Sequence, residues 1–179
     1  MLQWQHAHMT KTKKATAARA KNRARKYQAQ ANARKFLVVA DGSPESKSAL
    51  HYAFKRAENT KGGVIILAVI SPADFQHWLG VGNLMREEAE QEVRENIETM
   101  VKEAKTFSSI KPETVLRQGD QVDEIISLIE EDEDIAVMVL GASSDPDGPG
   151  PIISSLVSGH AGDFPIPVTI VPGDMTDEE

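Results

Sequence analysis

Five short apolar runs recur along the chain and alternate with segments of helical periodicity. Apolar runs of about four to eight residues between turn residues are typical of strands buried on both faces of a sheet. The third run is partly polar, which favours a position at the sheet edge. The predicted strands are residues 36–40, 64–70, 113–117, 134–140 and 167–171.

The segments between these runs carry apolar residues at a spacing of three or four, the period of an amphipathic helix. The first predicted helix has Pro44 at its first position and Ser43 as its N-cap. Two further helices are predicted over 84–107 and 120–133, and another begins at 151. Strands that alternate with helices predict parallel pairing through right-handed crossovers, and therefore a doubly wound, three-layer α/β/α sandwich.

The fourth predicted strand leads into a glycine turn, Gly141 to Ser144, and a long loop before the helix start at Pro151. This arrangement directs backbone N–H groups and a helix N-terminus at one spot above the sheet, where an anion such as a phosphate is stabilised. Asp41 ends the first strand at the same edge. Since ligands of such sheets bind beyond the carboxyl ends of the strands, the sequence predicts a shared cleft there.

The composition excludes several classes of site. Cysteine is absent from the 179 residues, which rules out disulfides, thiolate metal sites and cysteine nucleophiles. No apolar run approaches the roughly 20 residues that span a bilayer, and the N-terminus has no secretory apolar segment. We therefore expect a cytoplasmic protein with no membrane partner. No G-x-S-x-G elbow or His–acid pair indicates catalysis, so we predict neither an enzyme nor a metal site.

The net charge of −7 is divided unevenly along the chain. Residues 1–35 hold ten Lys and Arg and no acid, which leaves ten basic against 27 acidic residues in 36–179. An acidic body repels nucleic acid, so nucleic-acid contact is predicted only for the basic extension. Too few large apolar residues are present in 1–35 for folding, so this extension is predicted to be disordered. A nucleic-acid arm, an organellar presequence, an electrostatic partner for the body and a segment without a role all stay open. The predicted domain is 36–173, followed by an acidic tail, 174–179.

Four segments in this order resemble the universal stress proteins of the UspA type. They are residues 38–43 at the first strand end, 118–126, 139–141 and the closing 164–172. The resemblance covers 35–172. It implies the adenine nucleotide alpha hydrolase-like fold with strand order 3-2-1-4-5, a role in the stress response, and homodimers formed through the fifth strand.

The resemblance also implies a set of ligand-binding residues. Members of this family that bind ATP carry G-x2-G-x9-G followed by Ser or Thr around the phosphates, with an Asp and an aliphatic residue nearby. The matching positions in this chain are Asp41, Val69, Gly141, Ser144, Ser154 and Ser155. Serine replaces two of the glycines, which restricts the backbone and crowds its approach to a phosphate. Serine hydroxyls can still donate to phosphate oxygens.

Two acids in the joining loop weigh against this ligand. Asp145 and Asp147 would repel a triphosphate unless Mg²⁺ lay between them. Three hypotheses therefore stay open: a binding and signalling module with a partly degenerate site for ATP and Mg²⁺, a ligand-free dimeric scaffold of the same fold, and, with least support, slow ATP hydrolysis.

Overall fold

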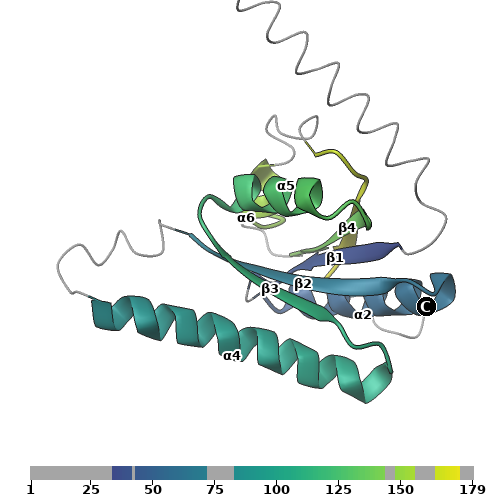
Figure 1. Ribbon diagram of the computed structural model, residues 1–179, viewed down its shortest axis with the longest axis horizontal. Helices are drawn as coiled ribbons and strands as arrows, with labels where there is room; N and C mark the ends of the chain where they lie inside the picture. The colour runs from purple at the N-terminus through teal and green to yellow at the C-terminus, as the bar shows by residue number, and fades with distance from the viewer. Residues whose placement is uncertain (1–33, 42, 72–82, 144–147, 156–163, 174–179) are drawn as a thin grey trace, which may run out of the picture. The chain divides into compact units, whose positions relative to one another are not determined.

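A computed structural model describes residues 34–41, 43–71, 83–143, 148–155 and 164–173 of the chain (Figure 1). Strands and helices alternate along these residues, and all five predicted strands are confirmed. In chain order the elements are β1 (Lys35–Val39), α2 (Glu45–Thr60), β2 (Gly63–Ile70), α4 (Asn83–Phe107), β3 (Glu113–Gln118), α5 (Gln121–Glu131), β4 (Ile135–Ala142), α6 (Pro151–Ser155) and β5 (Val168–Pro172).

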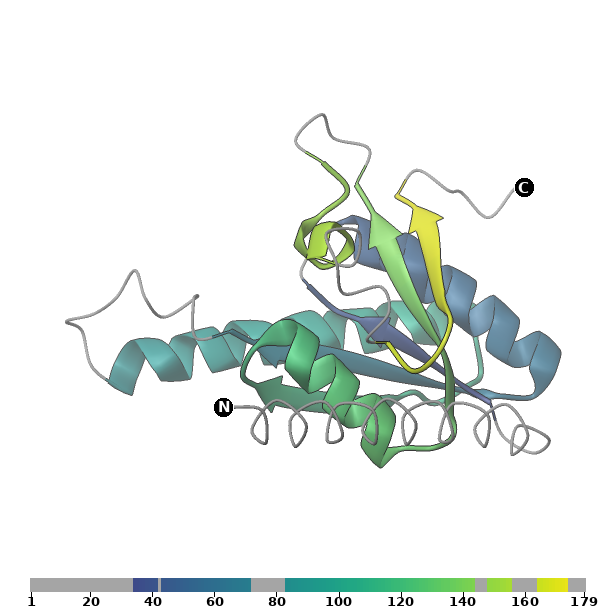
Figure 2. The ribbon, with the colours of Figure 1, turned by 90° about the horizontal axis from the view of Figure 1, so that it is seen from above.

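The strands form one sheet in the order β3-β2-β1-β4-β5, and every pairing is parallel. Figure 2 shows β4 and β5 side by side with their arrowheads pointing the same way. The predicted strand order is confirmed. The chain adds β2 and β3 on one side of β1 and then β4 and β5 on the other. The switch point of the sheet therefore lies between the carboxyl ends of β1 and β4, where ligands of this architecture bind.

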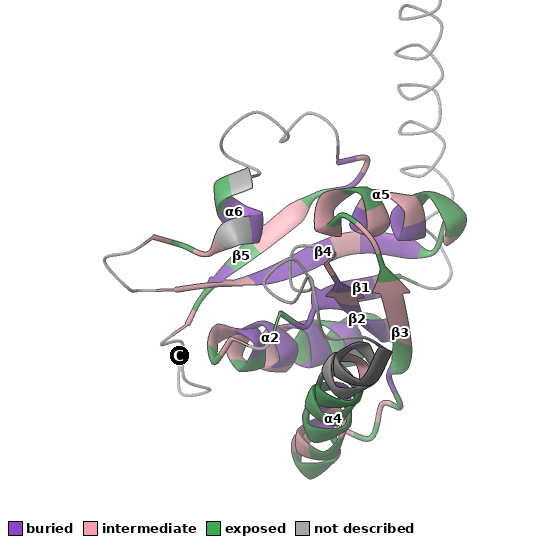
Figure 3. Cartoon of the chain, turned by 90° about the vertical axis from the view of Figure 1, so that its left-hand side faces the viewer, coloured by how far each residue is buried: buried purple, intermediate pink, exposed green. Residues whose placement is uncertain are grey.

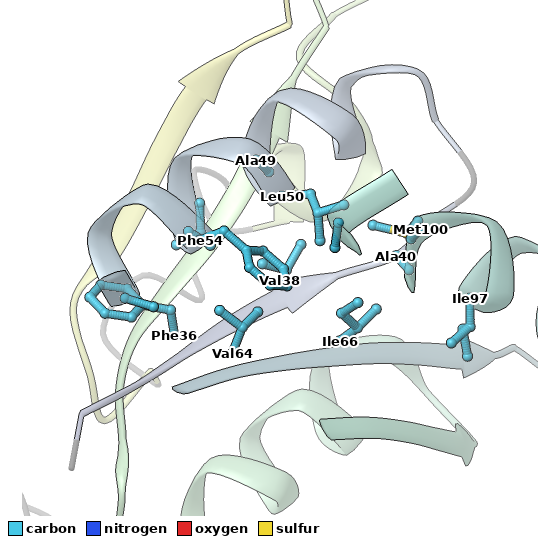
Figure 4. Packing of buried hydrophobic residues seen from close by; sticks show 14 of the residues in the cluster. Phe36, Val38, Ala40, Ala49, Leu50, Phe54, Val64, Ile66, Ile97 and Met100 are labelled. Carbon is cyan, nitrogen blue, oxygen red and sulfur yellow. The ribbon is translucent and has the colours of Figure 1, made fainter. Parts of the chain in front are cut away.

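Helices cover both faces of the sheet, with α5 and α6 on one face and α2 and α4 on the other (Figure 1). Alternate residues of β1 supply the two cores: Val38 packs under α2 and α4, and Leu37 packs under α5 and α6. Figure 4 shows Phe54 of α2 over the sheet, beside Val38 of β1. Val64 and Ile66 of β2 point to the same side of the sheet. The central strands are buried, whereas the outer face of α4 is exposed (Figure 3). The predicted three-layer α/β/α sandwich is therefore confirmed.

The start of α2 differs from the prediction. The N-cap is Pro44, which makes no side-chain capping bond, and the helix begins at Glu45. Ser43, the predicted N-cap, instead donates its hydroxyl to Asp41 Oδ1 at 2.6 Å. An N-cap hydroxyl accepts a backbone N–H of the first helical turn, whereas the Ser43 hydroxyl is directed at the Asp41 carboxylate, a charged acceptor that binds an O–H donor strongly.

Ion pairs join β3 to α5 on one face of the sheet. The Arg117 guanidinium donates to both carboxylate oxygens of Glu131, at 3.2 and 2.5 Å, and lies 3.9 Å from Glu124 Oε2. The hydrogen bonds from Arg117, and then that from Ser127, hold the pKa of Glu131 below its ordinary value of 4.5. The positive charge of Arg117 is therefore already compensated within the protein.

Candidate functional site

Three of the six predicted ligand residues lie near the carboxyl ends of strands. Asp41 follows β1, Val69 is the penultimate residue of β2 and Gly141 is the penultimate residue of β4. Ser154 and Ser155 are the last two residues of α6. The remaining predicted residue, Ser144, lies outside the described residues.

Asp41 organises the turn between β1 and α2. Its Oδ1 atom accepts hydrogen bonds from the Ser43 backbone N–H at 3.0 Å, from the Ser43 hydroxyl and from the Ser46 hydroxyl at 2.5 Å. Ser46 is buried, with 4% of its surface exposed. Among the described residues, no group donates to the other carboxylate oxygen, Oδ2. One oxygen of Asp41 therefore shapes the turn.

Gly141 is inside β4 and not in the turn that the sequence predicts. The strand continues to Ala142 because Gly141 and Ala142 pair with Val171 and Pro172 of β5. A Cβ on Gly141 would overlap the backbone carbonyl of Glu45 and lie 2.9 Å from the Glu45 Cβ. This glycine is required by the close packing of α2 on β4, whether or not a ligand binds.

A small hollow lies among the described residues at the switch point. Its volume is about 10 Å³, close to the space that one water molecule needs. The residues that line it come from β1, β4 and the start of α6: Val39, Asp41, Leu140, Gly141, Pro149, Gly150, Ile152 and Ile153. None of these carries a positive charge. The Ser154 backbone N–H donates to the Gly150 carbonyl at 2.9 Å, as in an ordinary helical turn.

Two glycines that the sequence analysis did not single out shape the approach to α6. Gly148 and Gly150 have φ angles of 116° and 103°, which non-glycine residues rarely adopt. No atom lies within 4 Å of a Cβ built on either residue, so both face open space. The signal in the sequence is the alternation Gly148-Pro149-Gly150-Pro151, in which each proline fixes φ and each glycine allows the reversal between them.

Comparison with known proteins identifies the family. A profile of the Universal stress protein family matches residues 32–172. The chain belongs to the universal stress protein family. No curated protein sequence matches it.

Solved universal stress proteins share its fold. The UspA protein from Lactobacillus plantarum is 18% identical, with a TM-score of 0.57 over 78% of this chain and 99% of that one. A universal stress protein from Archaeoglobus fulgidus is 17% identical, with a TM-score of 0.58 over 81% and 97%. One from Arabidopsis thaliana, solved with AMP bound, is 15% identical, with a TM-score of 0.54 over 78% and 91%.

The described charges near the carboxyl ends of the strands are mainly negative. In the sheet register Arg117 lies beside Val69, but Glu131 and Glu124 already compensate it. The described part of the chain contains no group of three or more His, Asp or Glu residues that could hold a metal ion. No helix among those described is long and apolar enough to cross a membrane.

Proposed function

We propose that this universal stress protein is a cytoplasmic stress-response module that acts by binding an adenine nucleotide, and not by turnover. The observation that carries the proposal is that Asp41 and Gly141 line one hollow at the switch point of the sheet, with Val69 near the end of the neighbouring strand β2. The AMP complex of the Arabidopsis relative supports the class of ligand.

Each residue has a role that its position allows. Val69 is half-buried against the core beneath α5, so its exposed part offers an apolar surface to the adenine. Asp41 accepts a ribose hydroxyl on Oδ2, or holds Mg²⁺ there together with phosphate oxygens and water. The Ser154 hydroxyl donates to the phosphate, and the family resemblance implies Ser144 and Ser155 as further hydroxyl donors.

Charge decides which nucleotide binds. No positive side chain is among the described residues that line the hollow, and Asp41 gives it a negative charge; the sequence adds two more acids, Asp145 and Asp147, in the segment between Gly141 and Pro151. A monophosphate brings fewer negative charges than a triphosphate. AMP should therefore bind without metal, whereas ATP should bind only with Mg²⁺, which compensates the phosphate charge.

Binding also requires movement, because pockets for small molecules measure about 300–1,000 Å³ and the hollow is far smaller. We infer that residues 149–153 move away from β1 when the nucleotide binds, with the backbone freedom supplied by the glycines at 148 and 150. A closed resting state reduces the apparent affinity by the fraction of molecules that are open. We expect an affinity for AMP that is micromolar or weaker.

Isothermal titration calorimetry of the full chain tests this proposal. AMP should give one saturable site, ATP should bind only with Mg²⁺, and GMP should bind more weakly. Ser154→Glu adds a negative charge at an exposed position beside the phosphate and should weaken AMP binding about tenfold. Thr99→Glu adds the same charge on the exposed face of α4 and should have no effect. Absence of saturable binding at millimolar AMP or ATP with Mg²⁺ would leave only the scaffold function.

A second candidate, a ligand-free dimeric scaffold, is favoured by β5. Among the strands that the structure describes, β5 pairs with β4 alone, and Ile170 on β5 is 49% exposed. Light scattering should find a dimer that Ile170→Lys converts to a monomer, while Gln118→Lys on the opposite edge strand leaves it intact. A monomeric wild-type protein would exclude the dimer.

A further inference from the structure

A second and larger cavity lies between the C-terminal half of α4 and the start of β3. Its volume is about 630 Å³, within the range of about 300–1,000 Å³ that is typical of small-molecule sites. It opens on the face of the sheet covered by α2 and α4, whereas the hollow beside Asp41 lies on the face of α6. The two sites are therefore independent.

The floor of this cavity is apolar. Ile97 and Pro112 are buried there, and Val101 and Ile110 are half-buried with their inner sides on the core beneath α2 and α4. A groove of about 260 Å³ continues from the cavity along β3 and shares Ile97 with it. The whole depression is elongated and suits a ligand with an extended or flat apolar body.

The rim of the cavity is basic, although the body of the protein is acidic. Three of the ten Lys and Arg residues in 36–179, Lys102, Lys105 and Lys111, line it. Lys102 lies 3.7 Å from Glu98, which is also on the rim. No carboxylate among the described residues lies within ion-pair distance of Lys105 or Lys111. By contrast, Lys35 is 3.0 Å or less from two carboxylates.

Hydroxyl groups also line the cavity. Ser108 and Ser109 line the cavity at the end of α4, and Thr114 lines it at the start of β3. The Ser108 hydroxyl already donates to Glu58 at 2.5 Å. The hydroxyls of Ser109 and Thr114 could therefore donate to an anionic group that pairs with Lys105 and Lys111.

We propose that this cavity binds a small amphiphile that carries a single carboxylate or sulfonate. The apolar body of the ligand lies on Ile97, Val101 and Ile110, and its anionic group pairs with Lys105 and Lys111. Charge complementarity selects this occupant, since the cavity concentrates positive charge on an otherwise acidic body.

The test is a fluorescence titration of the full chain with anilinonaphthalene sulfonate. The control probe is uncharged phenylnaphthylamine, which has the same rings without the sulfonate. The anionic probe should bind one saturable site about tenfold more tightly than the neutral probe. In a triple variant, Gln replaces Lys102, Lys105 and Lys111. This variant should bind the anionic probe about tenfold more weakly, because several exposed ion pairs are lost. Its binding of the neutral probe should not change.

A matched variant replaces Lys47, Lys55 and Lys61, three exposed lysines of α2 and its C-cap, by Gln. It removes the same total charge and should bind both probes like the wild type. The proposal is overturned if both lysine variants respond equally, or if the two probes bind equally well. Displacement of the anionic probe by AMP would also overturn it, because the probe would then lie at the other site.

Discussion

Replacement of Gly141 by alanine separates a packing role from a ligand role. The new Cβ would overlap the carbonyl carbon and oxygen of Glu45, which are backbone atoms at the start of α2. Flexible side chains could move aside at little cost, but here the first turn of a buried helix has to shift. Extra atoms forced into a packed site cost about 1–3 kcal/mol. We expect a loss of about 2 kcal/mol in the free energy of unfolding, or about 4–8 °C in Tm for a chain of this size.

Urea unfolding followed by circular dichroism measures this loss. The midpoint should fall while the m-value stays constant, since the surface exposed on unfolding does not change. Gly63→Ala is the control, because its Cβ would meet only the Lys35 side chain, at 3.5 Å. That variant should stay within about 0.5 kcal/mol of the wild type. Equal stability of the Gly141→Ala protein and the wild type would refute the packing argument and favour a role for Gly141 in ligand binding alone.

Two further predictions concern the polar contacts of Asp41 and Glu131. Ser46→Ala removes a buried hydroxyl that donates to Asp41 and should lower the free energy of unfolding by about 1.5–3 kcal/mol. Ser48→Ala, which removes a bond to the neutral Gly173 carbonyl, should cost only about 1 kcal/mol; an equal or larger loss for Ser48→Ala would contradict the charge-assisted bond. Arg117 lowers the pKa of Glu131 in the folded state. The ion pair therefore stabilises the folded protein above pH 4.5, and this stabilisation is lost as the pH falls through the folded-state pKa of Glu131. The stability difference between wild type and Glu131→Gln should therefore vanish in acid, and a difference independent of pH would show that the charge of Glu131 does not matter.

The fold could be predicted because each strand carries its own signal. Residues 64–70 form a continuous apolar run, which only a strand buried on both faces explains, and the helical periods between such runs require parallel crossovers. The strand order came from the resemblance. The end of β4 was wrong by two residues, since its extension depends on pairing with β5, which lies some thirty residues later in the chain.

The candidate site was less accessible to sequence reasoning. Asp41 could be placed at a strand end from the sequence. That one of its carboxylate oxygens accepts hydrogen bonds from both Ser43 and Ser46 depends on how α2 packs. Gly141 matched a phosphate-binding pattern, whereas the structure gives it a packing contact with Glu45. A glycine in a motif does not reveal which neighbour requires it, because that neighbour is distant in sequence.

A crystal structure of the full chain grown with AMP tests the central claim most directly. The account predicts adenine beside Val69, the phosphate near Ser154, and residues 149–153 displaced from β1. AMP bound elsewhere on the protein, or a hollow unchanged at saturating AMP, would contradict it.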